Sequence, residues 1–480
     1  MRNKLLTLFA ISVMAFNTSA QECNCGESFD WMVSTFEKND AGFQYVIDKK
    51  GMDDYKKHTA LFKEKAKGVS TLTDCQTIMF DWLLYFRPGH IAVSIKEPSS
   101  AEIRLKYKNE KTIDLTEKQL IAKLEKKKNK NPIEGVWSTT GYKIGIIGDE
   151  KSNKKFIGFI IKADSIYWMP KQIKAEFTLG DDKTYSVDYY KRDHSKEATQ
   201  AKFTNESGSI ISIFNNSWVR EYPKGTLSKK EEVVIKFSKA ELPFIEQLSN
   251  KTIYLRIPSF RAEQKRSIDS VLAKYDKLIT SIPNLIIDIR YGTGGADNSY
   301  NNIVPYLYTN PIRSVGIQLY ATELSAKGFE GYAKQFSDTA EANYCNGVAK
   351  KMRANLGKFI EGSDDKFSID SSYKVLPCPQ KVAIICHQNN GSTDEQFLID
   401  CKQSRKVKVF GRPTGGMLDI SNMNMVDSPD GKFQLGYCMS RSYRIPNYCI
   451  DGVGIQPDYF IDDTISEDDW IEYTRTVLEQ

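Results

Sequence analysis

Hydrophobic residues in the first part of the chain recur at helical spacing. One such face includes Trp31, Met32 and Phe36, and a second covers residues 78–86. The pattern has the period of amphipathic helices and stops at Arg-Pro-Gly, residues 87–89. We therefore predict an N-terminal helical domain over residues 21–100. A lysine-rich linker with one short helix, whose charges form a solvated face, is predicted over residues 101–132.

The pattern changes to short strands over residues 133–240. Four segments rich in β-branched and aromatic residues are separated by Gly, Asp and Asn, at 142–147, 156–161, 173–177 and 185–190. Frequent turns between brief strands predict a β-rich middle domain, either a small barrel or a sandwich. Such a domain could hold a ligand or a peptide, or serve only as a spacer, and the pattern favours neither.

Strands and helices alternate from residue 241 to residue 480. Apolar strands at 252–257 and 285–289 flank a helical pattern at 262–280, and the same order recurs over residues 382–410. Strand–helix–strand units of this kind place parallel strands in a sheet that is buried on both faces. The chain is therefore predicted to be a multidomain α/β protein with a C-terminal α/β core.

The first twenty residues have the pattern of a secretory leader. Arg2 and Lys4 precede an apolar run at 5–16, and small residues follow up to Ala20. This pattern predicts cleavage after Ala20 and export to the periplasm, the cell surface or the medium. The apolar run is too short to cross a bilayer, and no later run is long enough, so no membrane span is expected.

Nine cysteines follow the leader, and export permits disulfides between them. The predicted bridges join Cys23 or Cys25 to Cys75, and Cys438 to Cys449. An odd count leaves at least one thiol unpaired or intermolecular.

The composition is that of a globular protein, with 40% hydrophobic and 27% charged residues. It excludes collagen, a coiled coil and a wholly disordered chain. A net charge of +6 over 480 residues does not indicate a nucleic-acid-binding surface. The spacing of the cysteines and the four scattered histidines does not indicate a zinc site, and no metal or cofactor is expected.

Two turns that follow buried strands carry candidate chemistry. Ser392 stands between a strand and a helix, where a serine usually caps the helix. The functional alternative is a nucleophile at the positive end of the helix, with the Thr393 N–H free to bind an oxyanion. The second turn contains Gly292, Gly294 and Gly295, which would let the backbone approach a ligand.

The glycine-rich turn does not fit a dinucleotide-binding loop. Asp297 occupies the position of the last glycine of that motif, and its charge would repel a pyrophosphate. The segment could also be an ordinary turn that binds no ligand.

Four motifs in order resemble the C-terminal processing peptidases and the tricorn core, peptidase family S41. They are Asp-x-Arg-x-x-x-Gly-Gly at 288–295, Ser-x-x-Glu at 392–395, Gly-x-x-Thr at 411–414 and Gly-x-x-Pro-Asp at 454–458. The resemblance implies a ClpP/crotonase-like core and a serine peptidase that acts on proteins or peptides without a cofactor. It also implies that Ser392 is the nucleophile and that the Thr393 N–H and the Gly294/Gly295 loop form the oxyanion hole.

A serine nucleophile requires a base. One branch of the family supplies a lysine at a position where this chain has Met417, whereas the tricorn-like branch uses a histidine after an upstream helix. The resemblance therefore implies that His90 is the general base and that Asp451 orients it. His387, close to Ser392 in sequence, is an alternative base, although a histidine beside a buried strand is more often structural.

The chain also departs from the family pattern. Gly292 replaces the usual Asn, Gly89 replaces the Ser that precedes the histidine in tricorn, and the middle domain lacks a PDZ-like carboxylate-binding loop. These departures motivate a second hypothesis, a catalytically inactive S41-like protein that binds a peptide, a glycan or a lipophilic ligand.

Overall fold

The computed structural model describes residues 23–149, 152–182, 184–214, 216–336, 339–362 and 365–480. The predicted leader lies outside the described residues. The chain forms two units, each assembled from segments that are distant in sequence. The first unit contains the residues up to Lys96 together with 313–369 and 415–454, and the second contains 97–312, 370–414 and 455–480.

The first unit combines helices with an antiparallel sheet. Its helices are α1 (Cys25–Asn39), α2 (Phe43–Lys50), α3 (Met52–Ala66), α4 (Leu72–Leu83), α10 (Glu323–Ala333) and α11 (Thr339–Arg353). Its sheet has the order β1 (Ala92–Ile95), β20 (Phe433–Ser442), β14 (Ile317–Tyr320) and β15 (Phe359–Glu361), and β19 (Ile420–Asp427) also pairs with β20. Strands β13 (Ile312–Val315) and β16 (Phe367–Asp370) form a separate two-stranded sheet.

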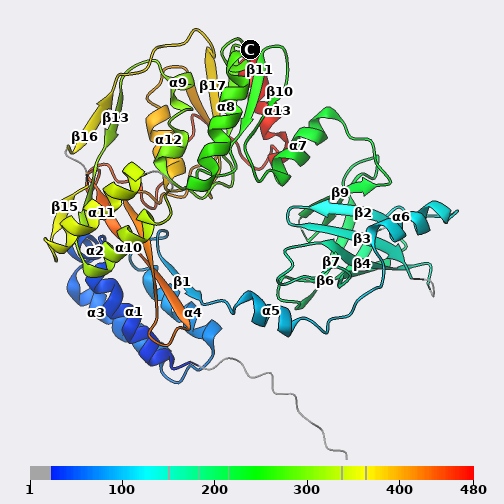
Figure 1. Ribbon diagram of the computed structural model, residues 1–480, viewed down its shortest axis with the longest axis horizontal. Coiled ribbons are helices and arrows are strands. Elements are labelled where there is room, and N and C mark those ends of the chain that lie inside the picture. The colour runs from blue at the N-terminus through cyan, green and yellow to red at the C-terminus, as the bar shows by residue number, and fades with distance from the viewer. Residues whose placement is uncertain (1–22, 150–151, 183, 215, 337–338, 363–364) are drawn as a thin grey trace, which may run out of the picture. The chain divides into compact units, whose positions relative to one another are not determined.

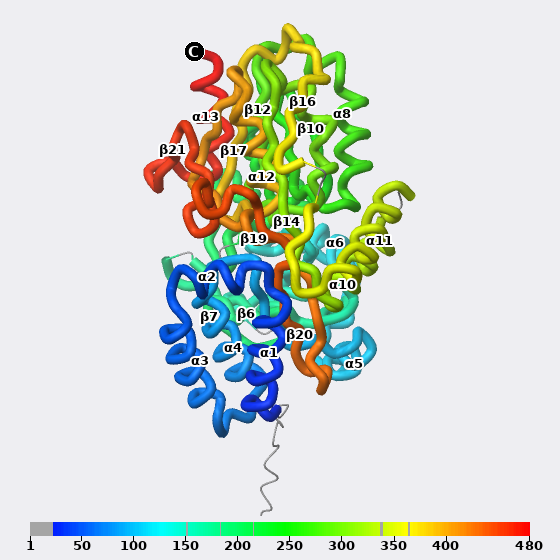
Figure 2. Tube along the Cα trace, turned by 90° about the vertical axis from the view of Figure 1, so that its left-hand side faces the viewer, coloured from blue at the N-terminus to red at the C-terminus, as the bar shows by residue number. Residues whose placement is uncertain are grey.

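The core of the first unit confirms the predicted N-terminal helices. Trp82 of α4 is fully buried, and Phe29 and Phe36 of α1 lie edge-on to it at ring-centroid distances of 6.0 and 5.8 Å. Figure 2 shows α1 beside the long strand β20, with which it is in contact. The sheet therefore joins the N-terminal helices to a segment some 400 residues later.

One of the predicted disulfides forms and the other does not. Cys25 and Cys75 are bonded and link α1 to α4. The predicted Cys438–Cys449 bridge is wrong, because both thiols are free and each has another neighbour. The Cys438 thiol lies 3.3 Å from the His90 carbonyl, whereas burial and a hydrogen bond to Asp419 raise the pKa of the Cys449 thiol to about 12.

The β-rich middle domain of the second unit is a closed antiparallel barrel, which confirms the barrel alternative (Figure 1). Its strands are β2 (Gly135–Thr139), β3 (Tyr142–Gly148), β4 (Lys155–Lys162), β5 (Ile173–Leu179), β6 (Tyr185–Tyr190), β7 (Lys196–Phe203), β8 (Ile210–Ile213) and β9 (Asn216–Tyr222). Each strand pairs with the next, and β9 closes on β2. Large side chains fill the interior, among them Trp137, Trp168 and Trp218, as expected for an eight-stranded barrel.

Two short helices precede the barrel, α5 (Ser100–Lys106) and α6 (Glu117–Lys126). Leu120 and Leu124 of α6 pack on Val136 and Phe159, so only the apolar face of the lysine-rich segment is buried. The sequence predicts one short helix in this segment, and the structure has α6 at that place and α5 before it.

The C-terminal core is a six-stranded sheet, which confirms the predicted α/β fold. Its order is β10 (Phe244–Gln247), β11 (Thr252–Arg256), β12 (Asn284–Asp288), β17 (Lys381–Cys386), β18 (Val407–Gly411) and β21 (Tyr459–Phe460). All neighbours from β11 onward are parallel. The associated helices are α7 (Lys229–Lys239), α8 (Lys265–Ile279), α9 (Val304–Leu307), α12 (Thr393–Cys401) and α13 (Trp470–Glu479).

The sheet register places two loops side by side. Asp288 at the end of β12 pairs with Ile385 near the end of β17, so the loops that follow these strands leave the same edge of the sheet. In open parallel sheets, sites form at this carboxyl edge. No helix within the described residues is both long enough and apolar enough to cross a membrane.

Candidate active site

Ser392 occupies a strained turn between β17 and α12. Its backbone has φ 59° and ψ −126°, a conformation that residues with a Cβ rarely adopt and that costs about 1–3 kcal/mol. Ser392 stands at the N-cap position of α12 but makes no capping hydrogen bond. The usual structural reason for a serine at this place, capping, therefore does not apply. A sharp strand-to-helix turn of this kind exposes a nucleophile in other hydrolase folds.

The first turn of α12 leaves one donor available beside Ser392. The N–H groups of Glu395 and Gln396 both donate to the Ser392 carbonyl, at 2.8 and 3.0 Å, and that of Asp394 donates to Gly391. The Thr393 N–H has no acceptor among the described residues. It lies at the positive end of the helix, where negative charge is stabilised.

The glycine loop after β12 lies directly against Ser392. Gly294 has φ +83°, and a Cβ placed on it would lie 2.7 Å from the Ser392 Cβ and 3.2 Å from the Thr393 nitrogen. Gly295 has φ +154°, and a Cβ there would lie 2.2 Å from the backbone of Phe260. Only glycine fits at both positions, and the structure therefore brings the predicted nucleophile and the predicted oxyanion loop together.

Buried polar contacts hold this loop and the helix in place. The Arg290 guanidinium donates to the Asp288 carboxylate at 2.7 Å, and Arg256 donates to the backbone carbonyls of both residues. The Thr393 hydroxyl donates to Asp297 at 2.7 Å and joins the start of α12 to the glycine loop. The Asp-x-Arg part of the first motif is therefore a structural clamp for the loop.

The remaining motifs meet behind Ser392. The Thr414 hydroxyl donates to the fully buried Glu395 carboxylate and accepts the Ile455 N–H at 2.7 Å. The Asp458 carboxylate accepts the Val409 N–H at 2.7 Å. These side chains lock α12, β18 and the terminal motif to one another, so their role is support of the Ser392 turn.

In the first unit, His90 is held as a specific tautomer. Its backbone has φ 53°, and its Nδ1 lies 2.7 Å from the carbonyl oxygen of Ile420. A carbonyl only accepts, so Nδ1 carries the hydrogen and Nε2 keeps its lone pair. Burial lowers the pKa of His90 below its ordinary value of 6.5. The ring is therefore neutral and basic near neutral pH.

Asp451 lies next to the backbone segment that His90 contacts. Its carboxylate accepts the N–H groups of Leu418, Asp419 and Ile420 at 2.7, 2.7 and 3.0 Å. It therefore holds the peptide whose carbonyl binds the imidazole. Its predicted role in orienting His90 stays a prediction. In this structure Asp451 is connected to the imidazole only indirectly, through this backbone segment.

A buried ion pair supports the turn that carries His90. Arg87 donates to the Asp40 carboxylate through both terminal nitrogens, one at 2.8 Å, and to the His90 carbonyl at 2.9 Å. Both side chains are at most 5% exposed. Sequence reasoning missed this pair: Arg87 adjoins the turn, but nothing in the local pattern pointed to Asp40, 47 residues earlier.

Residues 251–461 match the family model described as Peptidase family S41. Over this range the chain is similar to the S41 peptidases. The resemblance inferred from the four motifs is confirmed over this range. No curated protein sequence matches the chain significantly.

Several solved structures resemble the chain. Mature CPAF complexed with lactacystin has 10% sequence identity and a TM-score of 0.48, covering 95% of this chain and 97% of that one. The photosystem II D1 C-terminal processing protease has 13% identity and a TM-score of 0.38, covering 95% and 98%. The tricorn protease has 11% identity and a TM-score of 0.42, covering 95% of this chain and 36% of that one.

Met417, which the sequence comparison placed where one branch of the family has a lysine, packs against the turn before His90. A Cβ placed on Gly89 would lie 2.1 Å from the Met417 sulfur, so the Met417 side chain lies directly over the turn before His90. Two departures from the family pattern, Gly89 for Ser and Met417 for Lys, therefore belong together. The apolar methionine takes space that a serine at position 89 would require.

His387, the alternative base, has partners at both ring nitrogens. Its Nε2 lies 3.2 Å from the Glu467 carboxylate, and the Asn389 N–H points at Nδ1 from 3.4 Å. The side chain is buried and packs on Tyr291 at a ring distance of 4.8 Å. These contacts favour a structural role for His387.

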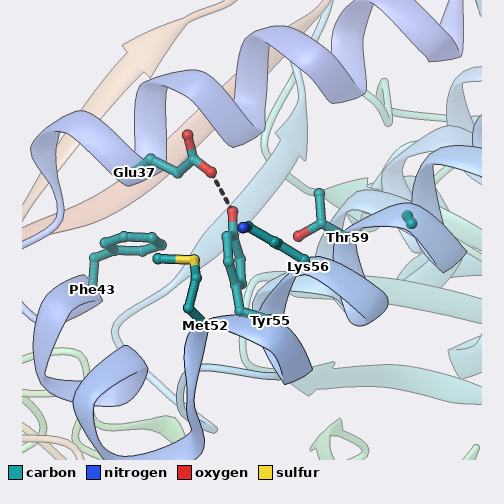
Figure 3. Close-up of a pocket in the computed structure, with 7 residues that line it drawn as sticks. Glu37, Phe43, Met52, Tyr55, Lys56 and Thr59 are labelled. Carbon is teal, nitrogen blue, oxygen red and sulfur yellow. Dashed lines mark hydrogen bonds between the residues drawn. The ribbon is translucent and has the colours of Figure 1, made fainter.

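A separate cavity of about 510 Å³ lies among α1–α3. It is lined by Glu37, Phe43, Met52, Tyr55, Lys56, Thr59 and Ala60. Figure 3 shows the Tyr55 hydroxyl donating to the Glu37 carboxylate beside Met52 and Phe43. None of the predicted site residues lines this cavity.

Proposed function

We propose that the protein is an exported serine endopeptidase that hydrolyses peptide bonds in proteins or peptides. The observation that carries the proposal is the strained, non-capping Ser392 beside the Gly294 loop of an S41 domain. Strain at a single polar residue persists where function requires its geometry. The free Thr393 N–H adjacent to it supports acyl-transfer chemistry.

In this proposal the Ser392 hydroxyl attacks the peptide carbonyl while the Nε2 of His90 takes its proton. His90 then gives the proton to the leaving amine, and an acyl-enzyme remains on Ser392. Water, activated by the same imidazole, releases the acyl product and regenerates the hydroxyl. The Thr393 N–H and the Gly294/Gly295 backbone stabilise the oxyanion in both steps.

Ser392 and His90 belong to different units of the chain. Proton transfer requires their Oγ and Nε2 atoms to come within about 2.6–3.2 Å in the active enzyme. The tautomer of His90 supports this role, because its basic nitrogen is the one not bonded to Ile420. Asp451 acts in the proposal as a positioning residue through the backbone at 418–420.

Export to an oxidising compartment is part of the proposal. The leader pattern at residues 1–20 indicates it, and the Cys25–Cys75 bond supports it because disulfides persist mainly outside the cytosol. The partners in this setting are protein or peptide substrates.

The experiment is hydrolysis of unfolded proteins and peptide libraries by the mature protein, with Ser392→Ala as the matched variant. We expect turnover by the wild type and none by the variant, with circular dichroism showing that both are folded. Turnover that persists in Ser392→Ala would remove Ser392 from its role. A folded wild type that cleaves nothing would favour the inactive, ligand-binding alternative.

A further inference from the structure

Asp394 is a buried acid that faces the glycine loop. It lies in the first turn of α12, two residues after Ser392, and is 1% exposed. A Cβ placed on Gly292 would lie 2.6 Å from its Oδ2 and 3.0 Å from its Oδ1. The carboxyl group therefore occupies the space that a side chain at position 292 would need, the position where family members usually have Asn.

The hydrogen bonds of Asp394 are incomplete for a carboxylate. The Asn390 amide donates to Oδ2 at 2.8 Å and also to the Ile289 carbonyl at 2.7 Å. Oδ1 has no hydrogen-bond partner among the described residues. Burying a charge with one oxygen unsatisfied is costly, whereas a neutral acid at the same place costs far less.

The surrounding groups agree with a neutral acid. Burial raises the pKa of Asp394 to about 7, against the opposing effects of the Asn390 amide and the Gly294 N–H. The charge of Glu395 on α12 raises the pKa further, and the charge of Arg256 on β11 lowers it. The Cys386 thiol on β17 also lies within its electrostatic reach.

The Gly294 N–H has two possible acceptors in this arrangement. The Gly294 N–H is close enough to the Asp394 carboxyl to lower its pKa, and Gly294 also lies against Ser392, so an ionised Asp394 competes for this N–H with an oxyanion formed at Ser392. A negative charge at Asp394 also opposes the developing negative charge of the oxyanion. Neither effect operates when Asp394 is protonated.

We propose that Asp394 is a positioning acid of the peptidase: its protonated form leaves the Gly294 N–H to the oxyanion, and its ionisation switches the site off. This inference rests on the proposed function. Asp394 releases its proton to solvent as the pH rises, and the proposal therefore assigns the alkaline limit of activity to this group.

The test compares pH profiles of kcat/KM for the wild type, Asp394→Asn and Asp400→Asn. Asp400 is a second buried acid of α12, whose carboxylate accepts the Tyr300 hydroxyl at 2.9 Å. We expect the wild type and Asp400→Asn to lose activity about tenfold per pH unit above about pH 7. Asp394→Asn should lose this alkaline limb and keep the acidic one. An unchanged alkaline limb in folded Asp394→Asn would overturn the inference.

A second measurement does not depend on activity or on the folding of a variant. Infrared spectra of the wild type with ¹³C-labelled aspartate should show one carboxyl group that stays protonated up to about pH 7. If no aspartate of the folded wild type titrates there, the inference fails even if peptide hydrolysis is found. If that carboxyl titrates but nothing is hydrolysed, the proposed function fails, and with it the positioning role of Asp394.

Discussion

The imidazole of His90 donates from Nδ1 to the carbonyl oxygen of Ile420 across 2.7 Å, although the two residues are 330 positions apart. This bond fixes the ring and leaves Nε2 as the basic nitrogen. The three backbone N–H groups that donate to Asp451 belong to the same segment, so this carboxylate holds the peptide group that binds the His90 ring.

The first prediction concerns the acidic limb of activity. The pKa of His90 is lowered from 6.5 by burial, so the base stays neutral until the pH falls below that value. Activity should fall with decreasing pH through a pKa below 6.5, and kcat/KM measured against pH reports it.

The controls for this limb are two histidine variants. His90→Gln should abolish turnover, whereas His58→Gln should keep the acidic limb. His58 is another partly buried histidine of the first unit, and its Nε2 contacts the Trp82 carbonyl at 3.1 Å. A wild-type acidic limb that survives unchanged in an active His90→Gln would contradict the assignment.

The second prediction concerns the Arg87–Asp40 pair. Arg87→Met leaves a buried carboxylate without its partner, and such losses cost about 3–5 kcal/mol. We expect the free energy of unfolding to fall by that amount and turnover to drop, because the His90 carbonyl also loses a donor. Lys63→Met breaks an exposed pair with Asp30 and should cost less than about 1 kcal/mol. Equal stability of the two variants in urea would refute this account.

The third prediction concerns the packing of Met417 over Gly89. Gly89→Ala places a methyl group against the Met417 side chain and should lower both stability and turnover. Shortening the methionine should relieve the clash, so Gly89→Ala/Met417→Ala should recover part of the loss. A double-mutant cycle in urea should give a coupling of about 0.5–3 kcal/mol. Simple additivity of the two changes would contradict direct contact.

The fourth prediction concerns Lys174, a buried lysine of the barrel. Its ammonium lies 4.2 Å from the Trp168 ring centroid and donates to the Tyr190 carbonyl, and burial lowers its pKa to about 7. In the unfolded chain the lysine stays protonated up to about pH 10. Between pH 7 and about pH 10 the unfolded state therefore binds more protons, and stability should rise with pH.

The rise should approach about 1.4 kcal/mol per pH unit where the folded state is deprotonated and the unfolded state is not. Lys174→Met should remove it, whereas Lys171→Met, at an exposed pair with Asp114, should keep it. Urea denaturation at pH 7, 8 and 9, followed by a signal from the barrel, measures the slope of the free energy of unfolding against pH. The same slope in Lys174→Met and the wild type would exclude Lys174 as its source.

The parallel sheet and the Ser392 turn were predictable because their signals are local. Apolar strands such as β12 and β17 are continuous runs, and the serine and glycine motifs follow them directly in sequence. The adjacency of the two loops follows from parallel pairing. The positive φ of Ser392 and its missing cap bond could not be predicted, since both depend on how the turn packs.

Contacts between distant segments could not be derived from the sequence. Arg87 meets Asp40, and His90 meets the Ile420 carbonyl, because three segments build the first unit, and no periodicity in the sequence indicates such contacts. The Cys438–Cys449 prediction failed for the same reason, because short spacing does not show what each thiol faces. The sequence likewise could not show that the Asp394 carboxyl fills the space beside Gly292.

The most direct test of the central claim is the site and rate of fluorophosphonate labelling of the mature protein, read by mass spectrometry. A serine activated by a histidine should form a single phosphonyl adduct on Ser392, and the rate should fall at least about a hundredfold in His90→Gln. Ser392→Ala should not be labelled. Labelling of folded protein at another residue, or at Ser392 with a rate unaffected by His90→Gln, would contradict the account.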